Sequence, residues 1–92
     1  MILDTDKDTI IALAGQYDVG EMLLFGSGAD PQKQSSDIDL AVEGIAPEKF
    51  FTFYGDLFFH LSRPVDLIDL TSDTKFNNLI RREGIRLYGR TA

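Results

Sequence analysis

The connections between three short strand-like runs constrain the fold of this chain more than any other feature. The first two runs, Met22–Phe25 and Asp37–Val42, are joined by a polar loop at 28–36, whereas a helix-length segment precedes the third, Val65–Leu70. A parallel crossover requires a dozen or more residues, so the first two runs are antiparallel if they are neighbouring strands. The longer connection suits a right-handed parallel crossover. These lengths predict a mixed sheet.

Helical spacing of apolar residues predicts helices around this sheet. The first covers 6–17, where Thr5 with Asp8 resembles a capping box. The second begins at Pro47, a favoured first helical residue, and runs to about His60.

The third helix is expected to end at Arg82, and its candidate N-caps are Thr71, Ser72 and Asp73. Its predicted buried stripe consists of Phe76, Leu79 and Ile80. Gly84 ends this helix, and Ile85–Tyr88 is expected to leave as an extended tail. The prediction is one α/β (α+β) domain over residues 1–92, in αββαβα order, with a mixed sheet flanked by helices.

Composition and charge exclude several classes of protein. The 92 residues are 43% hydrophobic and 26% charged, as in one globular domain, and no apolar run approaches the roughly 20 residues of a membrane span. The chain has no cysteine for a disulfide and no secretory signal pattern, so we expect a cytoplasmic protein. A net charge of −6 disfavours long nucleic acid but allows a small, metal-bound anion.

Polar residues of the predicted strands converge at one edge of the sheet. Gly26 and Ser27 end the first strand, whereas Asp37 begins the second and Asp66 lies at the start of the third. Asp39 is two residues beyond Asp37, so the two carboxylates share a face about 6.5 Å apart. Carboxylates in this arrangement can flank two magnesium ions, which prefer oxygen ligands.

A simpler interpretation is that Asp37 and Asp39 belong to the solvated face of a strand, after an ordinary turn at Ser35-Ser36. The combination with Gly26-Ser27 and Asp66 favours a metal site instead. Asp69 falls on the opposite strand face and is not expected to join it. His60 is the only histidine and has no second ligand nearby in the sequence, so a catalytic or metal role is not expected.

Together these residues resemble the signature of the DNA polymerase β superfamily of nucleotidyltransferases. The matching segments are Gly26-Ser27, Ser36–Leu40 and Val65–Ile68, and the ending Ile80–Tyr88 is similar to the minimal, MNT-type branch. The resemblance implies the polymerase β-like fold and the transfer of a nucleoside monophosphate from a nucleoside triphosphate, with ATP favoured, to a hydroxyl.

The same resemblance implies the roles of individual residues. Gly26 and Ser27 would hold the β- and γ-phosphates, Asp37 and Asp39 would ligate two Mg²⁺ ions (or Mn²⁺), and Asp66 would ligate one ion and act as general base. It also implies a small helical HEPN-type protein as partner, in an antitoxin and toxin pair. The sequence leaves open whether the chain also forms a homo-oligomer.

The chain departs from this branch in the phosphate loop. Where the branch carries Ala-Arg-Gly, this sequence reads Ala29-Asp30-Pro31, which places an anion beside the triphosphate. Lys33, Arg81 and Arg82 are the cations that could compensate. An alternative function is therefore a binding module that neutralises a helical partner by contact, and a stand-alone antibiotic nucleotidyltransferase is a third.

Six aromatic residues lie within 50–59. On a helical wheel most of them form one buried stripe, which includes Phe58. Phe51 lies at its margin and Phe59 points away, so these two rings are candidates for a partner surface.

Overall fold

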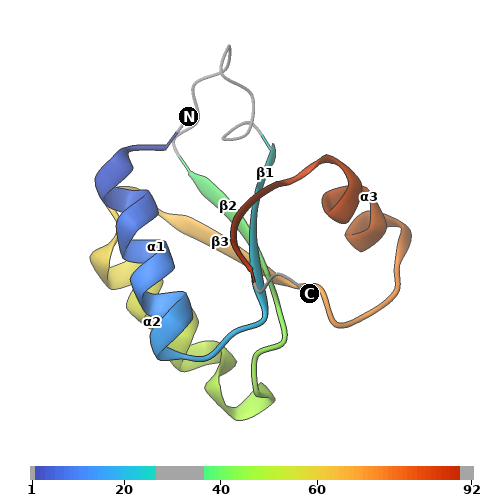
Figure 1. The fold of residues 1–92 in the computed structure, drawn as a ribbon, viewed down its shortest axis with the longest axis horizontal. Helices are drawn as coiled ribbons and strands as arrows, with labels where there is room; N and C mark the ends of the chain where they lie inside the picture. The colour runs from blue at the N-terminus through green and yellow to red at the C-terminus, as the bar shows by residue number, and fades with distance from the viewer. Residues whose placement is uncertain (1, 27–36, 90–92) are drawn as a thin grey trace.

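The computed structural model describes residues 2–26 and 37–89 (Figure 1). The elements are α1 (Asp4–Gln16), β1 (Glu21–Phe25), β2 (Ile38–Glu43), the 3-10 turn η2 (Pro47–Lys49), α2 (Phe50–His60), β3 (Val65–Asp69), α3 (Lys75–Glu83) and β4 (Ile85–Gly89). All predicted helices and strands are present, with small differences in their bounds. Of the described residues, no helix is long and apolar enough to cross a membrane.

The strands form one mixed sheet in the order β3-β2-β1-β4. β1 pairs antiparallel with β2, and β2 pairs parallel with β3, as the two connection lengths predict. The mixed sheet and the parallel crossover through α2 are therefore confirmed.

The segment predicted as an extended tail is instead the strand β4, which pairs antiparallel with β1. An unpaired β1 would expose a row of backbone N–H and C=O groups, and β4 satisfies them. Gly84 permits the tight entry into this strand. A Cβ there would lie 2.7 Å from the Ile80 carbonyl oxygen and 3.3 Å from the Leu23 Cβ.

The two faces of the sheet are covered unequally, with α1 and α2 on one face and α3 on the other (Figure 1). The larger core joins α1 and α2 to alternate strand residues such as Met22, Ile38 and Leu40. The smaller core contains Leu23 and Ala41 and lies under α3. Because side chains alternate along a strand, Phe25 and Asp39 also lie on the α3 face.

Two local helix predictions are wrong. The N-cap of α1 is Leu3, without a side-chain cap, so Thr5 and Asp8 form no capping box. The N-cap of α3 is Thr74, whose hydroxyl oxygen accepts from the Asn77 N–H, so the cap lies beyond the predicted candidates at 71–73.

The predicted apolar stripes are also only partly buried. Within the stripe of α3 only Ile80 is buried, while Phe76 is 53% and Leu79 is 44% exposed. In α2, Phe53 and Leu57 are the buried residues, whereas Phe58 is 61% exposed. Apolar spacing shows which side chains share one face of a helix. It does not show how many of them contact the sheet, and here only part of each stripe does.

Candidate active site

A row of residues crosses three strands near one end of the sheet. In the register of the sheet, Phe25 of β1 pairs with Asp39 of β2, and Asp39 pairs with Asp66 of β3. Neighbouring strands are about 4.8 Å apart, so the two aspartates lie side by side. Asp37, two residues before Asp39, belongs to the same face. The convergence derived from strand directions therefore holds for Gly26, Asp37, Asp39 and Asp66.

The electrostatics of Asp39 reflect this crowding. Burial raises the pKa of the Asp39 carboxyl above its ordinary value, and the charges of Asp66 and then Asp37 raise it further. The charges of Asp66 and Asp37 thus disfavour the ionised form of Asp39 in the absence of a cation. A carboxylate whose pKa is raised by neighbouring carboxylates is frequent at functional sites, because a bound cation reverses the effect.

Gly26 lies directly against this cluster. Its φ of +68° is in the left-handed region, and a Cβ at this position would lie 2.3 Å from Asp39 Oδ2. Only glycine allows the backbone to turn this close to the carboxylate. The end of β1 therefore approaches the Asp39 carboxylate more closely than a residue with a Cβ would allow.

The donor set suits magnesium. Among the described residues, no three Asp, Glu, His or Cys side chains are gathered closely enough to hold a metal ion by themselves. Magnesium does not require such a cage, since it usually takes one or two protein carboxylates and completes its shell with water and phosphate oxygens. Adjacent oxygen donors beside a glycine turn fit that pattern.

Comparison with known families decides the class of protein. Residues 8–92 match the family described as polymerase beta, nucleotidyltransferase. The chain belongs to this family. The resemblance inferred from Gly26, Asp37, Asp39 and Asp66 is thereby confirmed at the level of the family, and the polymerase β-like fold with it. The search of curated protein sequences found no match for this chain.

The fold of this chain is similar to chains in solved toxin-antitoxin structures. It is 26% identical to a chain in a toxin-antitoxin crystal structure with AMP-PNP, covering 96% of this chain and 75% of that one with a TM-score of 0.76. It is 27% identical to a chain in the structure of a tri-AMPylated Shewanella oneidensis HEPN toxin in complex with MNT antitoxin, covering 92% and 71% with a TM-score of 0.67. The MntA-HepT toxin-antitoxin, at 24% identity and a TM-score of 0.71, shows the same fold.

Other residues considered from the sequence are engaged away from the carboxylates. Asp69 accepts hydrogen bonds from the backbone N–H and hydroxyl of Thr71, so it has a local role. His60 is exposed, with Nδ1 2.9 Å from the Asp56 carbonyl oxygen. Neither residue is among the carboxylates that the sheet register brings together at Asp39 and Asp66.

Arg81, one of the cations that could compensate for Asp30, is engaged elsewhere in the structure. The Arg81 guanidinium contacts Glu43 at 2.6 Å and also donates to the Leu70 carbonyl. Glu43 ends β2, at the opposite end of the sheet from Asp39, so Arg81 is not the compensating cation. Ser27, Asp30, Pro31 and Lys33 lie outside the described residues.

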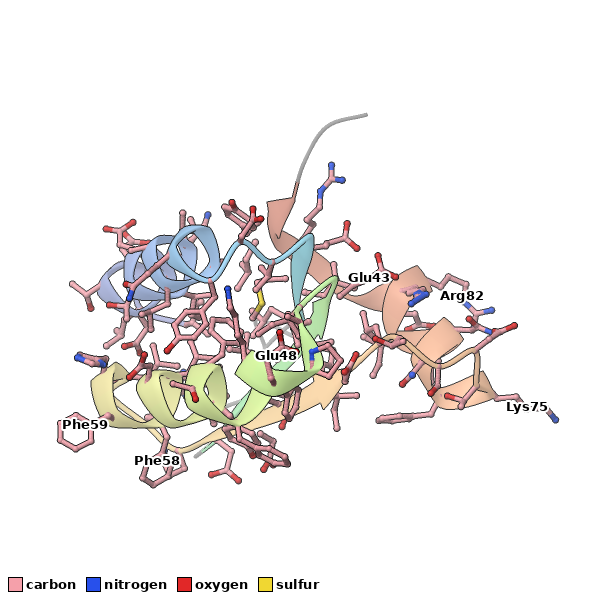
Figure 2. The ribbon with its side chains drawn as sticks, turned by 90° about the horizontal axis from the view of Figure 1, so that it is seen from below. Glu43, Glu48, Phe58, Phe59, Lys75 and Arg82 are labelled. Carbon is pink, nitrogen blue, oxygen red and sulfur yellow. The ribbon has the colours of Figure 1, made fainter. Side chains whose placement is uncertain are left out.

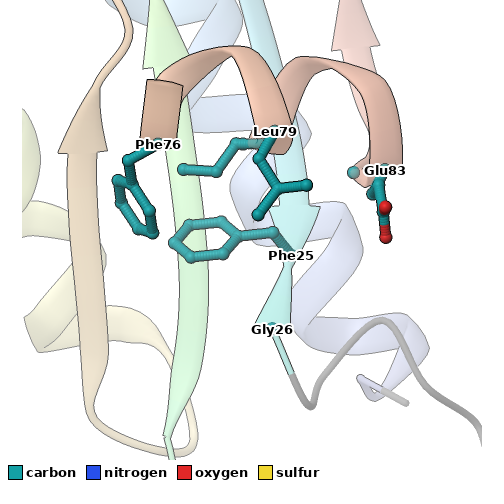
Figure 3. Close-up of a pocket in the computed structure, with 7 residues that line it drawn as sticks. Phe25, Gly26, Phe76, Leu79 and Glu83 are labelled. Carbon is teal, nitrogen blue, oxygen red and sulfur yellow. The ribbon is translucent and has the colours of Figure 1, made fainter. Parts of the chain in front are cut away.

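A pocket of about 480 Å³ adjoins the carboxylate row at Gly26, and the sequence does not predict it (Figure 3). It lies between β1 and α3, and its lining includes Phe25, Gly26, Phe76, Leu79 and Glu83. Phe76 and Leu79 carry the sequence signal of this surface, but their helical spacing predicts a packed stripe rather than a pocket wall.

Proposed function

We propose that this chain is a magnesium-dependent nucleotidyltransferase that transfers the nucleoside monophosphate of a triphosphate, ATP in particular, to a hydroxyl on a HEPN-type partner. The observation that carries the proposal is the row of adjacent carboxylates, Asp39 and Asp66, against the glycine turn at Gly26. Membership of the nucleotidyltransferase family supports the reaction class. Similarity to structures that contain AMP-PNP or an AMPylated HEPN toxin supports the donor and the acceptor.

The reaction requires one bond to form and one to break. The acceptor hydroxyl oxygen attacks the α-phosphorus, the bond from that phosphorus to the bridging β-oxygen breaks, and pyrophosphate leaves. Asp66 accepts the hydroxyl proton. Its side chain is exposed at the start of β3, where an acceptor can reach it, whereas Asp39 is partly buried beside it.

The other site residues position the donor. Asp37 and Asp39 would hold the magnesium ions, with Asp66 shared, and Gly26 with Ser27 would hold the β- and γ-phosphates. Bound magnesium neutralises phosphate charge, which phosphoryl-type transfer needs more than covalent help from the protein. Gly26 contributes because the absence of a Cβ leaves space beside Asp39 Oδ2.

An exposed aromatic patch on α2 suits contact with the partner. Phe51 and Phe59 are 81% and 85% exposed, as the helical wheel predicts, and Phe58 adds to them at 61%. Phe58 and Phe59 extend from the outer side of α2 (Figure 2). Three exposed rings on one short helix form an apolar surface of the kind that marks interaction sites.

Transfer is tested by incubating the protein with α-phosphate-labelled ATP, Mg²⁺ and its cognate partner. We expect label on a partner hydroxyl with wild-type protein, and loss of label with Asp66→Asn while the complex still forms. EDTA should abolish the transfer. Asp69→Asn is the matched control on β3 and should transfer normally. Undiminished label with Asp66→Asn would show that Asp66 is not the general base.

The second candidate is neutralisation of the partner by contact alone, which the exposed Phe51, Phe58 and Phe59 favour. It predicts equal neutralisation by wild type and Asp66→Asn without any label on the partner. Phe59→Ala should weaken the complex under either function, because the ring has little contact with its own chain. Unchanged complex formation in Phe59→Ala excludes this ring from the interface.

A further inference from the structure

We propose that the pocket between β1 and α3 binds the nucleobase of the triphosphate donor and that its carboxylate rim favours adenine. This inference rests on the proposed function, because it assigns the base to a position next to the phosphates. No part of the transfer chemistry requires this pocket, so the base and phosphate subsites can be tested apart.

The pocket is continuous with the carboxylate row. Gly26 lines the pocket and also approaches Asp39, while Phe25 lines the pocket and is the register partner of Asp39. A triphosphate held at Gly26 by Asp39 and its neighbours therefore has the pocket directly beside it. The volume of about 480 Å³ lies in the range of small-molecule sites.

The lining suits a flat aromatic ligand. Phe25 and Phe76 form an edge-to-face pair with ring centroids 6.2 Å apart and an interplanar angle of 84°. Phe76, at 53% exposed, and Leu79, at 44% exposed, present apolar surface that their own chain leaves uncovered. In Figure 3 both side chains extend from α3 toward Phe25. A base inserted here would cover this surface by stacking.

Glu83 provides polarity at the rim of this apolar lining. A carboxylate accepts hydrogen bonds and cannot donate them when ionised. Adenine offers the N6 amino group as a donor, whereas guanine presents the O6 acceptor at the equivalent position. Glu83 therefore favours adenine over guanine among the purines, which stack over the larger area.

The test compares ATP with tripolyphosphate, which has the phosphates but no base, each with Mg²⁺ and measured by calorimetry. Phe76→Ala should weaken ATP binding by about tenfold, the size expected for loss of one stacked ring, and leave tripolyphosphate binding unchanged. Phe76→Tyr retains the ring and should bind both ligands like wild type. Asp39→Asn should weaken both ligands together.

These outcomes separate the two proposals. Unchanged ATP binding in Phe76→Ala, or equal weakening of ATP and tripolyphosphate, overturns the base pocket. Unchanged binding of both ligands in Asp39→Asn overturns the metal and phosphate site instead. Occupation of the pocket by a partner helix would appear as partner binding lost in Phe76→Ala with ATP binding retained.

Base choice is tested separately with Glu83→Gln. The amide can donate as well as accept, so the ratio of GTP to ATP dissociation constants should fall several-fold relative to wild type. Glu48→Gln is the control, because Glu48 is an exposed glutamate of η2 that does not line the pocket. An unaltered ratio in Glu83→Gln removes Glu83 from base recognition.

Discussion

At the scale of single residues, the negative charge of Asp39 destabilises the folded state. Burial, Asp66 and Asp37 raise the pKa of its carboxyl. The protonated Asp39 carboxyl therefore stabilises the fold fully below the unfolded-state pKa, about 3.9. This stabilisation is lost as pH rises through the higher folded-state pKa. We expect Asp39→Asn to stabilise the metal-free protein at pH 7 by about 0.5 kcal/mol, after allowing for solvent screening.

Urea unfolding in EDTA at pH 7 and pH 3 measures this effect. The advantage of Asp39→Asn should be present at pH 7 and disappear at pH 3, where the wild-type carboxyl is protonated. Asp69→Asn is the control, because the amide oxygen can still accept from Thr71. A gap between wild type and Asp39→Asn that is equal at both pH values contradicts electrostatic repulsion as the cause.

The glycines provide a second test at the same scale. Gly26→Ala places a Cβ 2.3 Å from Asp39 Oδ2 at a φ of +68°, so we expect a loss of about 1–2 kcal/mol in unfolding free energy. Magnesium-nucleotide binding should be lost as well, because Asp39 must move.

Gly55→Ala is the matched control for this substitution. Gly55 lies inside α2, and a Cβ there meets nothing within 4 Å. Replacing it should stabilise the protein by about 0.5–1 kcal/mol without affecting ligands. Denaturant unfolding and calorimetry measure both variants, and equal behaviour of the two would refute the close approach at Gly26.

At the scale of elements, α3 forms one wall of the pocket beside Gly26, and its first turn depends on Thr74. The Thr74 hydroxyl oxygen accepts from the Asn77 N–H at 3.0 Å. We expect Thr74→Ala to cost about 1 kcal/mol of unfolding free energy, because the N–H loses its partner. Ser72→Ala should cost much less, since Ser72 contacts Asn77 through its backbone carbonyl.

Hydrogen exchange should locate the effect of Thr74→Ala. Faster exchange is expected in the first turn of α3, with the strands β2 and β3 unaffected. If Ser72→Ala destabilises the helix as much as Thr74→Ala, the cap belongs to the segment predicted from the sequence rather than to Thr74.

At the scale of the whole molecule, a buried carboxylate links α1 to the segment between α2 and β3. Asp6 of α1 is 3% exposed and accepts from the Ser62 N–H at 3.1 Å and its hydroxyl at 2.5 Å. We expect Asp6→Ala to lower global stability by about 1–2 kcal/mol because both bonds are lost. The midpoint of thermal unfolding should fall by about 4–8 °C per kcal/mol in a domain of this size.

Asp8→Ala is the control, because Asp8 is exposed on the same helix. It should change the midpoint little. Equal shifts in Asp6→Ala and Asp8→Ala would indicate that the cost comes from helix α1 alone and not from its link to Ser62.

Much of the fold and part of the site follow from the sequence alone. Connection lengths determined the strand directions, because a short loop cannot make a parallel crossover. Period-two alternation placed Asp37 and Asp39 on one face and separated Asp69 from Asp66. Both are local or near-local constraints, so a single sequence carries them.

Only the tertiary structure decided the remaining features, because each depends on a neighbour distant in the chain. Ile85–Gly89 becomes a strand only because β1 offers an unpaired edge. The buried Asp6 carboxylate accepts hydrogen bonds from Ser62, which is 56 residues away in the sequence. Phe76 and Leu79 have the spacing of core residues, yet Phe25 and Gly26 leave a pocket where the stripe would have packed. Periodicity specifies which side chains share a face, whereas packing decides whether that face is filled.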